Sequence, residues 1–378
     1  MQIIFVILMF AAYFAAAIYL FMHIRQALPP VLPLRIFYTV AFVFVALSLF
    51  AYMFCRNVLP SNLLKIMYLV GSTWLVVLIY LAAYFLFTDI ILFAIKKFHF
   101  IAANFSPHVL RQIQVVSGLV ILAIVLISGY CKFNNPTIVE KDITVKKDFF
   151  INSNKKSSLK IVAVSDLHLG HGIGKKRLKR FVEMINAQNP DVVLIAGDLV
   201  DASPRPLFEQ RMFEEIDEIH APFGVFMCLG NHEYISGVTQ SLNFIKKTKI
   251  IPLLDSIVDI GNLSIVGRKD LAAHTRLNLS ELTKNIPVEN IKILLDHQPY
   301  NLSETQQNGI DLQISGHTHD GQFFPINLIV KQLFELPHGY TQKIDTHYIV
   351  SSGLGLWGPP YRIGTQSELW VINLTFEK

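Results

Sequence analysis

Five short segments rich in Asp, His and Asn stand out in the second half of the chain. Each of them follows a short apolar run that has the character of a buried strand. The segments are Asp166-Leu167-His168, Gly197-Asp198-Leu199-Val200-Asp201, Gly230-Asn231-His232-Glu233, Asp296-His297 and Gly316-His317-Thr318-His319. Because open α/β sheets collect ligands at the carboxyl ends of their strands, we expect the five segments to meet in one cleft.

The residue types in these segments are those that bind divalent metal ions. Carboxylate, amide and imidazole groups without thiolates suit Mn, Fe or Zn. Seven candidate ligands are too many for one tetrahedral site, and their number suits two metals that share a carboxylate. Two metals about 3.5–4 Å apart can hold the attacking and leaving oxygens of a displacement at phosphorus. Gly197, Gly230 and Gly316 would permit tight turns and a close backbone approach.

Strand-like and helix-like stretches alternate through this half of the chain, which predicts an α/β domain from about residue 158. The expected strands are 160–164, 192–196, 225–229, 263–266, 291–295, 312–314 and 348–350, and the expected helices are 178–185, 207–219, 240–247 and 277–284. We find no internal repeat and no low-complexity segment.

The first third of the chain is apolar, and hydrophobic residues make up 52% of the whole sequence. Four stretches are long enough to cross a bilayer, which takes roughly 20 helical residues. They are Ile3–Met22, Leu34–Cys55, Ile66–Phe87 and Gln114–Cys131. A lone carboxylate is costly in hydrocarbon, so we place Asp89 at or near an interface. No span carries a cluster of ionisable groups, which favours an anchor over a transporter.

We therefore predict a four-helix transmembrane region at 1–131, a linker at 132–157 with an edge strand near Ile143–Val145, and a globular domain at 158–378. Four spans put both ends of the chain on one side of the membrane. Positive charges in the first and third loops favour an exoplasmic globular domain, and those in the second loop and after the last span favour the opposite. Short loops weigh more than the flank of a long domain, so we expect the exoplasmic side.

In their order, the five segments resemble the motifs of the calcineurin-like metallophosphoesterase superfamily. The spacing and the stretch from Ser352 to Arg362 resemble its YkuE/YaeI-type branch, which includes membrane-associated members. The resemblance covers about residues 158–375 and is specific because five ordered motifs coincide. It implies two β-sheets packed face to face and flanked by helices, with the site at one edge. Asp320 departs from the branch, which usually has Gly there.

The resemblance also implies a role for each site residue. Asp166, His168 and His319 would bind one metal, Asn231, His297 and His317 would bind the other, and Asp198 would bridge them. His232 would act catalytically with Asp198 by protonating the leaving group or steadying the phosphoryl oxygens. Asn231, His232 and Arg362 would contact the substrate, although Arg362 could equally belong to a surface loop. Asp201 is expected to hold the turn or a ligand imidazole, and His171 to lie in an exposed loop.

The function that we expect is hydrolysis of a phosphodiester, phosphomonoester or pyrophosphate bond by a membrane-anchored enzyme. Two divalent ions would serve as cofactors, with Mn expected and Fe or Zn as alternatives. The membrane spans favour a lipid-linked or membrane-proximal substrate. The alternative is a non-catalytic, metal-dependent binding or signalling module on a membrane anchor. The net charge of +5 includes no basic run that would indicate nucleic-acid binding, and no motif points to a protein partner.

Overall fold

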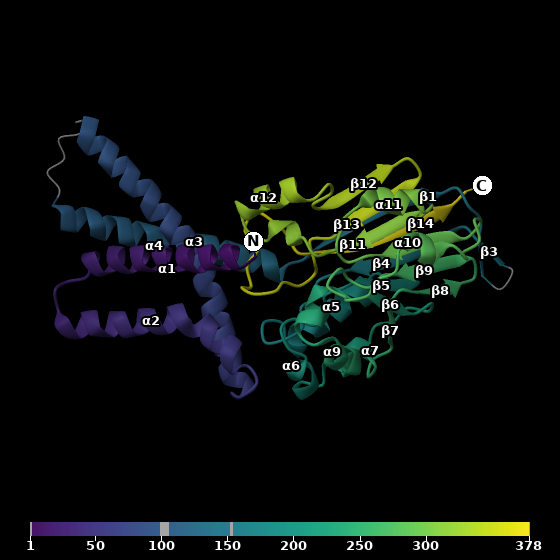
Figure 1. Ribbon diagram of the computed structural model, residues 1–378, viewed down its shortest axis with the longest axis horizontal. Coiled ribbons are helices and arrows are strands. Elements are labelled where there is room, and N and C mark those ends of the chain that lie inside the picture. Colours follow the sequence, from purple (N-terminus) through teal and green to yellow (C-terminus); the bar gives the residue numbers. More distant parts are fainter. Residues whose placement is uncertain (1, 99–105, 152–153, 378) are drawn as a thin grey trace. The chain divides into compact units, whose positions relative to one another are not determined.

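The computed structural model describes residues 2–98, 106–151 and 154–377 (Figure 1). The chain divides into two compact units. The first comprises the chain up to Ser128 together with Gly358–Pro360, and the second comprises Gly129–Trp357 and Tyr361–Lys378. The expected fold class is confirmed, because apolar N-terminal helices precede an α/β domain with two mixed sheets.

The N-terminal helices are α1 (Gln2–Ala27), α2 (Leu32–Cys55), α3 (Ser61–Phe98) and α4 (Pro107–Asn134). All four are long and apolar enough to cross a membrane. The described residues contain no other helix with these properties. The third span runs on as one helix of 38 residues because no Gly or Pro interrupts it after Phe87.

Glycines let the N-terminal helices approach one another closely. A Cβ atom at Gly71 of α3 would lie 2.4 Å from the backbone nitrogen of Leu49 on α2. A Cβ atom at Gly118 of α4 would lie 2.8 Å from the ring of Tyr84 on α3. Small residues at such crossings are typical of helices that pack within a bilayer, where close van der Waals contact stabilises association.

Three of these helices together build a polar cluster that no single span contains. Asp89 of α3 lies 2.8 Å from His23 Nε2 and accepts a hydrogen bond of 2.9 Å from Tyr19, both on α1. From α4, Arg111 and Gln114 donate to Asp89 over 3.1 and 3.0 Å. The cluster was not expected from the spans taken singly, and it compensates the charge of Asp89 with that of Arg111.

The second unit contains two six-stranded sheets. The strands of the first, in spatial order, are β1 (Thr137–Val145), β14 (Glu368–Phe376), β4 (Ser158–Val164), β5 (Val192–Ala196), β6 (Val225–Cys228) and β7 (Ile250–Leu253). Those of the second are β12 (Gly339–Lys343), β13 (Thr346–Val350), β11 (Leu312–Ser315), β10 (Ile291–Leu295), β9 (Leu263–Gly267) and β8 (Ser256–Ile260). A short hairpin joins β2 (Phe149–Ile151) to β3 (Asn154–Lys156).

The two sheets pack face to face around an apolar core. Along β4, Ile161 and Ala163 belong to the core between the sheets, whereas Val162 and Val164 face a second core on the other side of the first sheet. This alternation follows from the two-residue period of a strand. Because both faces are covered, the central strands β5 and β6 are apolar at every position rather than alternating with polar residues.

Short helices connect the strands. They are α5 (Lys175–Asn186), α6 (Arg205–Glu209), α7 (Met212–Asp217), α8 (Asn231–Ile235), α9 (Val238–Ile245), α10 (Leu279–Thr283), α11 (Leu302–Gln307) and α12 (Ile326–Leu333), with a 3-10 turn at His319–Gly321. Figure 1 shows α5, α7 and α9 lying along the first sheet. Phe181 of α5 and Phe244 of α9 are buried in the second apolar core, so these helices cover that face.

The stretch expected to be a linker contains a long strand. β1 pairs in parallel with β14 over nine residues, from Thr137 opposite Glu368 to Val145 opposite Phe376. Its partner lies 231 residues farther along the chain. The second unit therefore begins before residue 158, and β1 forms the edge of its first sheet.

Candidate metal centre

The polar segments lie at the carboxyl ends of strands from both sheets. Asp166 and His168 follow β4, and Asp198 follows β5, all in the first sheet. In the second sheet His297 follows β10, and His317 and His319 follow β11. Asn231 begins α8, just after β6. The face-to-face packing brings these strand ends together, as the sequence predicted.

One group of side chains gathers around Asp166. His319 Nε2 lies 3.4 Å and His168 Nε2 lies 3.7 Å from Oδ1 of Asp166, and the two imidazole nitrogens are 3.1 Å apart. All three side chains are buried. Donor atoms at these distances face a common point, and the group could hold one metal ion.

A second group surrounds Asn231. Its Oδ1 atom lies 2.8 Å from His317 Nδ1 and 3.2 Å from His297 Nε2. Asp198 lies between the groups, because its Oδ2 atom is 3.2 Å from His297 Nε2 and 3.6 Å from His168 Nε2. A carboxylate in this position could be shared by two metal ions.

Five of these residues have an unusual backbone conformation. Asp166, His168, Asp198, His317 and His319 have φ angles between 47° and 70°, in the left-handed region. Residues other than glycine rarely adopt this conformation, and such strain concentrates at functional sites. The surrounding fold therefore holds the candidate ligands in place at a cost in local stability.

Three glycines leave room for the ligands. A Cβ atom at Gly197 would lie 2.5 Å from His297 Nδ1, one at Gly230 would lie 2.2 Å from Oδ1 of Asp198, and one at Gly316 would lie 2.3 Å from Oδ2 of Asp166. Each contact is too short for a side chain. At these three glycines the backbone therefore lies close against the candidate ligands.

Glu233 organises the loops around Asp198 and Asn231. Its buried carboxylate accepts hydrogen bonds from the backbone N–H groups of Gly230, Asp198 and Val200 over 2.7, 3.1 and 2.8 Å. Burial and the nearby Asp198 raise its pKa to about 7. We assigned no role to Glu233 from the sequence, although a Glu at the third position of a helix is the pattern of a capping box.

Asp201 stands behind two imidazoles. Its Oδ1 atom lies 3.3 Å from Nδ1 of His232 and 3.6 Å from Nδ1 of His168. In each ring this leaves Nε2 as the nitrogen that does not face Asp201. This geometry is consistent with the expectation that Asp201 holds a ligand imidazole, and it adds His232 as a second partner.

His297 is oriented in a similar way. Its Nδ1–H group donates a hydrogen bond of 2.7 Å to the carbonyl oxygen of Ala196, which leaves Nε2 as the nitrogen that faces Asp198. Such a backbone partner fixes the tautomer that a metal ligand needs.

The charges of the cluster favour cation binding. Burial works to raise the pKa values of Asp166 and Asp198, but His319 and His297 respectively hold them well below the usual range. Burial lowers the pKa of His317 to about 4 and that of His319 well below its ordinary value. The carboxylates are therefore charged, and these two imidazoles are neutral with a lone pair to offer.

Two other imidazoles compensate the buried carboxylates. Burial works to lower the pKa of His168, but Asp166, Asp201 and Asp198 outweigh it and raise this pKa to about 10. The carboxylates likewise raise the pKa of His297. Divalent cations could supply this positive charge in place of the protons. The donor set therefore fits a pair of divalent metal ions.

Arg362 lies outside the cavity, although the sequence suggested a substrate contact for it. Its side chain is fully buried and donates to the carbonyl oxygens of His319, Ser352, Gly353 and Gly355 over 2.5–3.3 Å. Burial lowers its pKa to about 10. The guanidinium ties the loop of His319 to the loop before Trp357, which is a positioning role.

The site opens into a cavity of about 330 Å³. Asp198, Asn231, His232, His317 and His319 line it. His171 is buried rather than exposed as expected, with 6% of its surface accessible, and it is not among these lining residues. Asp320 is half-buried beside His319, and burial raises its pKa.

Comparisons with known proteins agree with this geometry. The model of the calcineurin-like phosphoesterase family matches residues 159–321. An uncharacterized metallophosphoesterase of Campylobacter jejuni is 34% identical over 280 residues, which are 71% of this chain and 72% of the relative. A transmembrane protein with a metallophosphoesterase domain from Danio rerio is 29% identical over 69% of this chain and 62% of its own length. The uncharacterized metallophosphoesterase YkuE of Bacillus subtilis is 28% identical over 65% of this chain and 89% of its own length.

Proposed function

Because this chain belongs to the calcineurin-like metallophosphoesterase family, we propose that it is a membrane-anchored hydrolase of phosphoester or pyrophosphate bonds. The observation that carries the proposal is the convergence of seven side chains of metal-ligand type from five strand ends, four of which (Asp198, Asn231, His317 and His319) line one cavity. Asp166, His168 and His319 form one group. Asn231, His297 and His317 form the other, and Asp198 lies between the two groups.

We assign the ligands by this grouping. Asp166, His168 and His319 would hold one divalent ion, and Asn231, His297 and His317 would hold the other. Asp198 would bridge the two. Such ions, when bound, would supply Lewis-acid chemistry, which polarises phosphoryl oxygens and makes water more acidic. We propose Mn as the metal, because oxygen and imidazole ligands without thiolate suit it.

His232 and Asp201 would together protonate the leaving group during hydrolysis. As the P–O bond to the leaving group breaks, the leaving oxygen takes up a proton, which His232, a lining residue of the cavity, would donate. Asp201, next to Nδ1 of His232, would orient the ring and stabilise its protonated form. Asn231 lines the same cavity and would contact the phosphoryl group.

The four apolar helices bear on where the substrate is found. They favour a lipid-linked or membrane-proximal phosphoester over a freely soluble one.

We further propose that the catalytic unit is exoplasmic, as the charges of the short loops favour. A reporter that is active only outside the cytoplasm, fused after the last residue, should be active, and a reporter that is active only in the cytoplasm should be inactive.

Hydrolysis of an aryl phosphodiester by the purified full-length chain tests the function. With Mn²⁺ added, bis(4-nitrophenyl) phosphate should release nitrophenolate, and a chelator should stop the release. The Asp198→Asn variant, matched in size, should lose this activity while retaining the circular dichroism of the parent. Equal rates for the parent and the variant would show that the release does not arise at this site.

The same preparation distinguishes the alternative function. A chain that binds two Mn²⁺ ions but hydrolyses neither aryl esters, phospholipids nor nucleotide-sugar lipids would be a metal-dependent binding module. Metal content is measured by elemental analysis after gel filtration, independently of turnover.

A further inference from the structure

The lining of the site cavity includes apolar residues. Ile326, Val330, Phe334 and Trp357, which we call the apolar wall, line it together with Asp198, Asn231 and the imidazoles. A phosphate bound at the ligands would therefore have an apolar surface beside it. The group attached to that phosphate is the part of the substrate that this surface would contact.

The apolar wall is built by the periodicity of α12. Ile326, Val330 and Phe334 are spaced four residues apart and form one stripe along the helix and its C-terminal cap. Ile329 and Leu333 lie next to this stripe and are 58% and 65% exposed. The apolar surface thus continues from the cavity to the outside of the unit.

Two aromatic rings join this wall to the catalytic groups. The ring of Trp357 has its centroid 6.4 Å from that of His232, and the ring of Phe334 has its centroid 6.1 Å from that of His317. The apolar surface therefore starts at the ligands themselves, and a chain only a few carbon atoms from phosphorus would already touch it.

We propose that this wall binds an aliphatic chain of the substrate, so that the substrate is a phospholipid or another phosphoester with an alkyl or acyl tail. The inference rests on the proposed function and narrows it to one substrate class. It assigns Val330 and Trp357 as specificity-determining residues. Burial of the chain against α12 supplies the affinity, since the hydrophobic effect scales with apolar area removed from water.

The polar groups near the wall argue against a nucleotide base as the occupant. The Gln322 amide donates to the carbonyl oxygen of Trp357, and the Thr318 hydroxyl donates to that of Pro337. These donors are thus engaged within the protein. Aliphatic side chains on α12 offer no hydrogen bonds to a base, and the four apolar helices place the chain where lipids are abundant.

A series of substrates with one leaving group tests the inference. We suggest ethyl, butyl and hexyl 4-nitrophenyl phosphate, hydrolysed with Mn²⁺ by the full chain in lipid nanodiscs. Full burial of one methylene improves binding by about fourfold. The hexyl ester has four more methylenes than the ethyl ester, so even their partial burial should lower KM at least about tenfold. Equal KM values across a series that is hydrolysed would overturn the inference and leave the proposed function intact.

Matched variants locate the effect on the wall. Val330→Asn places a polar group in the stripe, and Trp357→Ala removes the aromatic part of the wall from a different segment. Each should bring the ratio of the ethyl to the hexyl KM close to one. Leu328→Asn is the control, because Leu328 is 49% exposed on the same helix and about 200° away from Ile326 and Val330. Its ratio should equal that of the parent.

A binding measurement keeps the inference testable if no ester is hydrolysed. Calorimetry with ethyl and hexyl phosphate in the presence of Mn²⁺ should show at least about tenfold tighter binding of the hexyl compound, and Val330→Asn should remove the difference. Equal binding of the two would overturn the inference. Tighter binding of adenosine monophosphate than of hexyl phosphate, lost in Trp357→Ala, would also overturn it and assign the wall to a base.

Discussion

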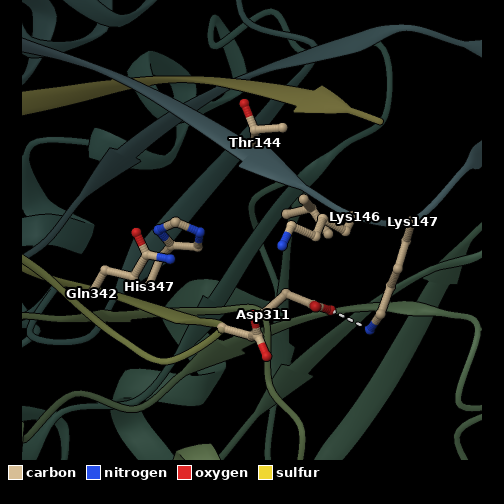
Figure 2. Close-up of a pocket in the computed structure, with 8 residues that line it drawn as sticks. Thr144, Lys146, Lys147, Asp311, Gln342 and His347 are labelled. Carbon is tan, nitrogen blue, oxygen red and sulfur yellow. Dashed lines mark hydrogen bonds and ion pairs between the residues drawn. The ribbon is translucent and has the colours of Figure 1, made fainter. Parts of the chain in front are cut away.

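Two polar cavities among the described residues of the second unit are similar in size but differ in how their charged groups are arranged. The candidate site occupies about 330 Å³ at the carboxyl ends of the strands. A cavity of about 390 Å³ is lined by Thr144, Lys146, Lys147, Asp311, Gln342 and His347, among others (Figure 2). Both contain carboxylate and imidazole groups, so residue type and volume do not distinguish them.

The cavity of Figure 2 has its buried charges already paired. Lys147 donates to Asp311 over 2.7 Å, and the same carboxylate oxygen accepts the backbone N–H of Lys292. His347 Nδ1 lies 2.8 Å from the hydroxyl of Tyr340. These groups satisfy one another, and they leave little drive for an ion to bind.

The candidate site is arranged differently. His168 Nε2 and His319 Nε2 face each other at 3.1 Å, and both lie near the buried carboxylate of Asp166. Nδ1 of His319 has no hydrogen-bond partner among the described residues. Two imidazole nitrogens that face each other beside a carboxylate form an arrangement that a cation could bind. The two cavities therefore differ in the arrangement of their donor atoms more than in their composition.

The largest expected effect is that of removing the charge of Asp198. Asp198→Asn should lower kcat by about 10²–10³-fold or more, because the carboxylate proposed to bridge the two metal ions would no longer hold them at the reacting centre. Bound Mn²⁺ should fall below two ions per chain by elemental analysis. A variant that keeps both ions and full activity would contradict the bridging role.

The next effect separates a proton donor from the residue that orients it. His232→Asn should lower kcat about 10²-fold for an alkyl leaving group, and Asp201→Asn about tenfold. The loss from His232→Asn should shrink for nitrophenolate, which leaves without a proton. Equal losses for both leaving groups would argue against a general acid.

A smaller effect is expected at Arg362. Arg362→Lys keeps the charge but cannot reach all the carbonyl oxygens of the two loops, and buried carbonyls left unpaired destabilise the fold by about 1–3 kcal/mol. Thermal unfolding should occur at lower temperature, and the Kd for Mn²⁺ should rise because the loop of His319 loosens. A substrate-contact role would instead raise KM without changing either property.

The smallest effect on catalysis is expected in the cavity of Figure 2. Asp311→Asn breaks the pair with Lys147 and should reduce stability by about 1–2 kcal/mol, seen as a lower unfolding temperature. Both kcat and Mn²⁺ content should stay within about twofold of the parent, because this pair has no part in the proposed chemistry. A large loss of activity would show that the two cavities are coupled.

Local patterns in the sequence predicted the family, the α/β class and the apolar helices. Strand runs such as Val192–Ala196 can be recognised from a few adjacent apolar residues. In the five motif segments, Asp, Asn or His follows such a run directly. The ligand assignment is still a prediction, although the structure gathers its members. The assignment could be made from the sequence because each motif is contiguous and the motifs occur in the order of the family.

Tertiary structure decided what depends on distant pairing. β1 finds β14 some 230 residues away, Asp89 meets His23 and Arg111 from other helices, and Arg362 turns inward to backbone carbonyls. The position of α12 beside the ligands belongs to the same class of facts. The sequence by itself determined which residues could do the chemistry, because residue type and local spacing are encoded within a few positions. Which of their donor atoms face one another was decided only when packing brought separate segments into contact.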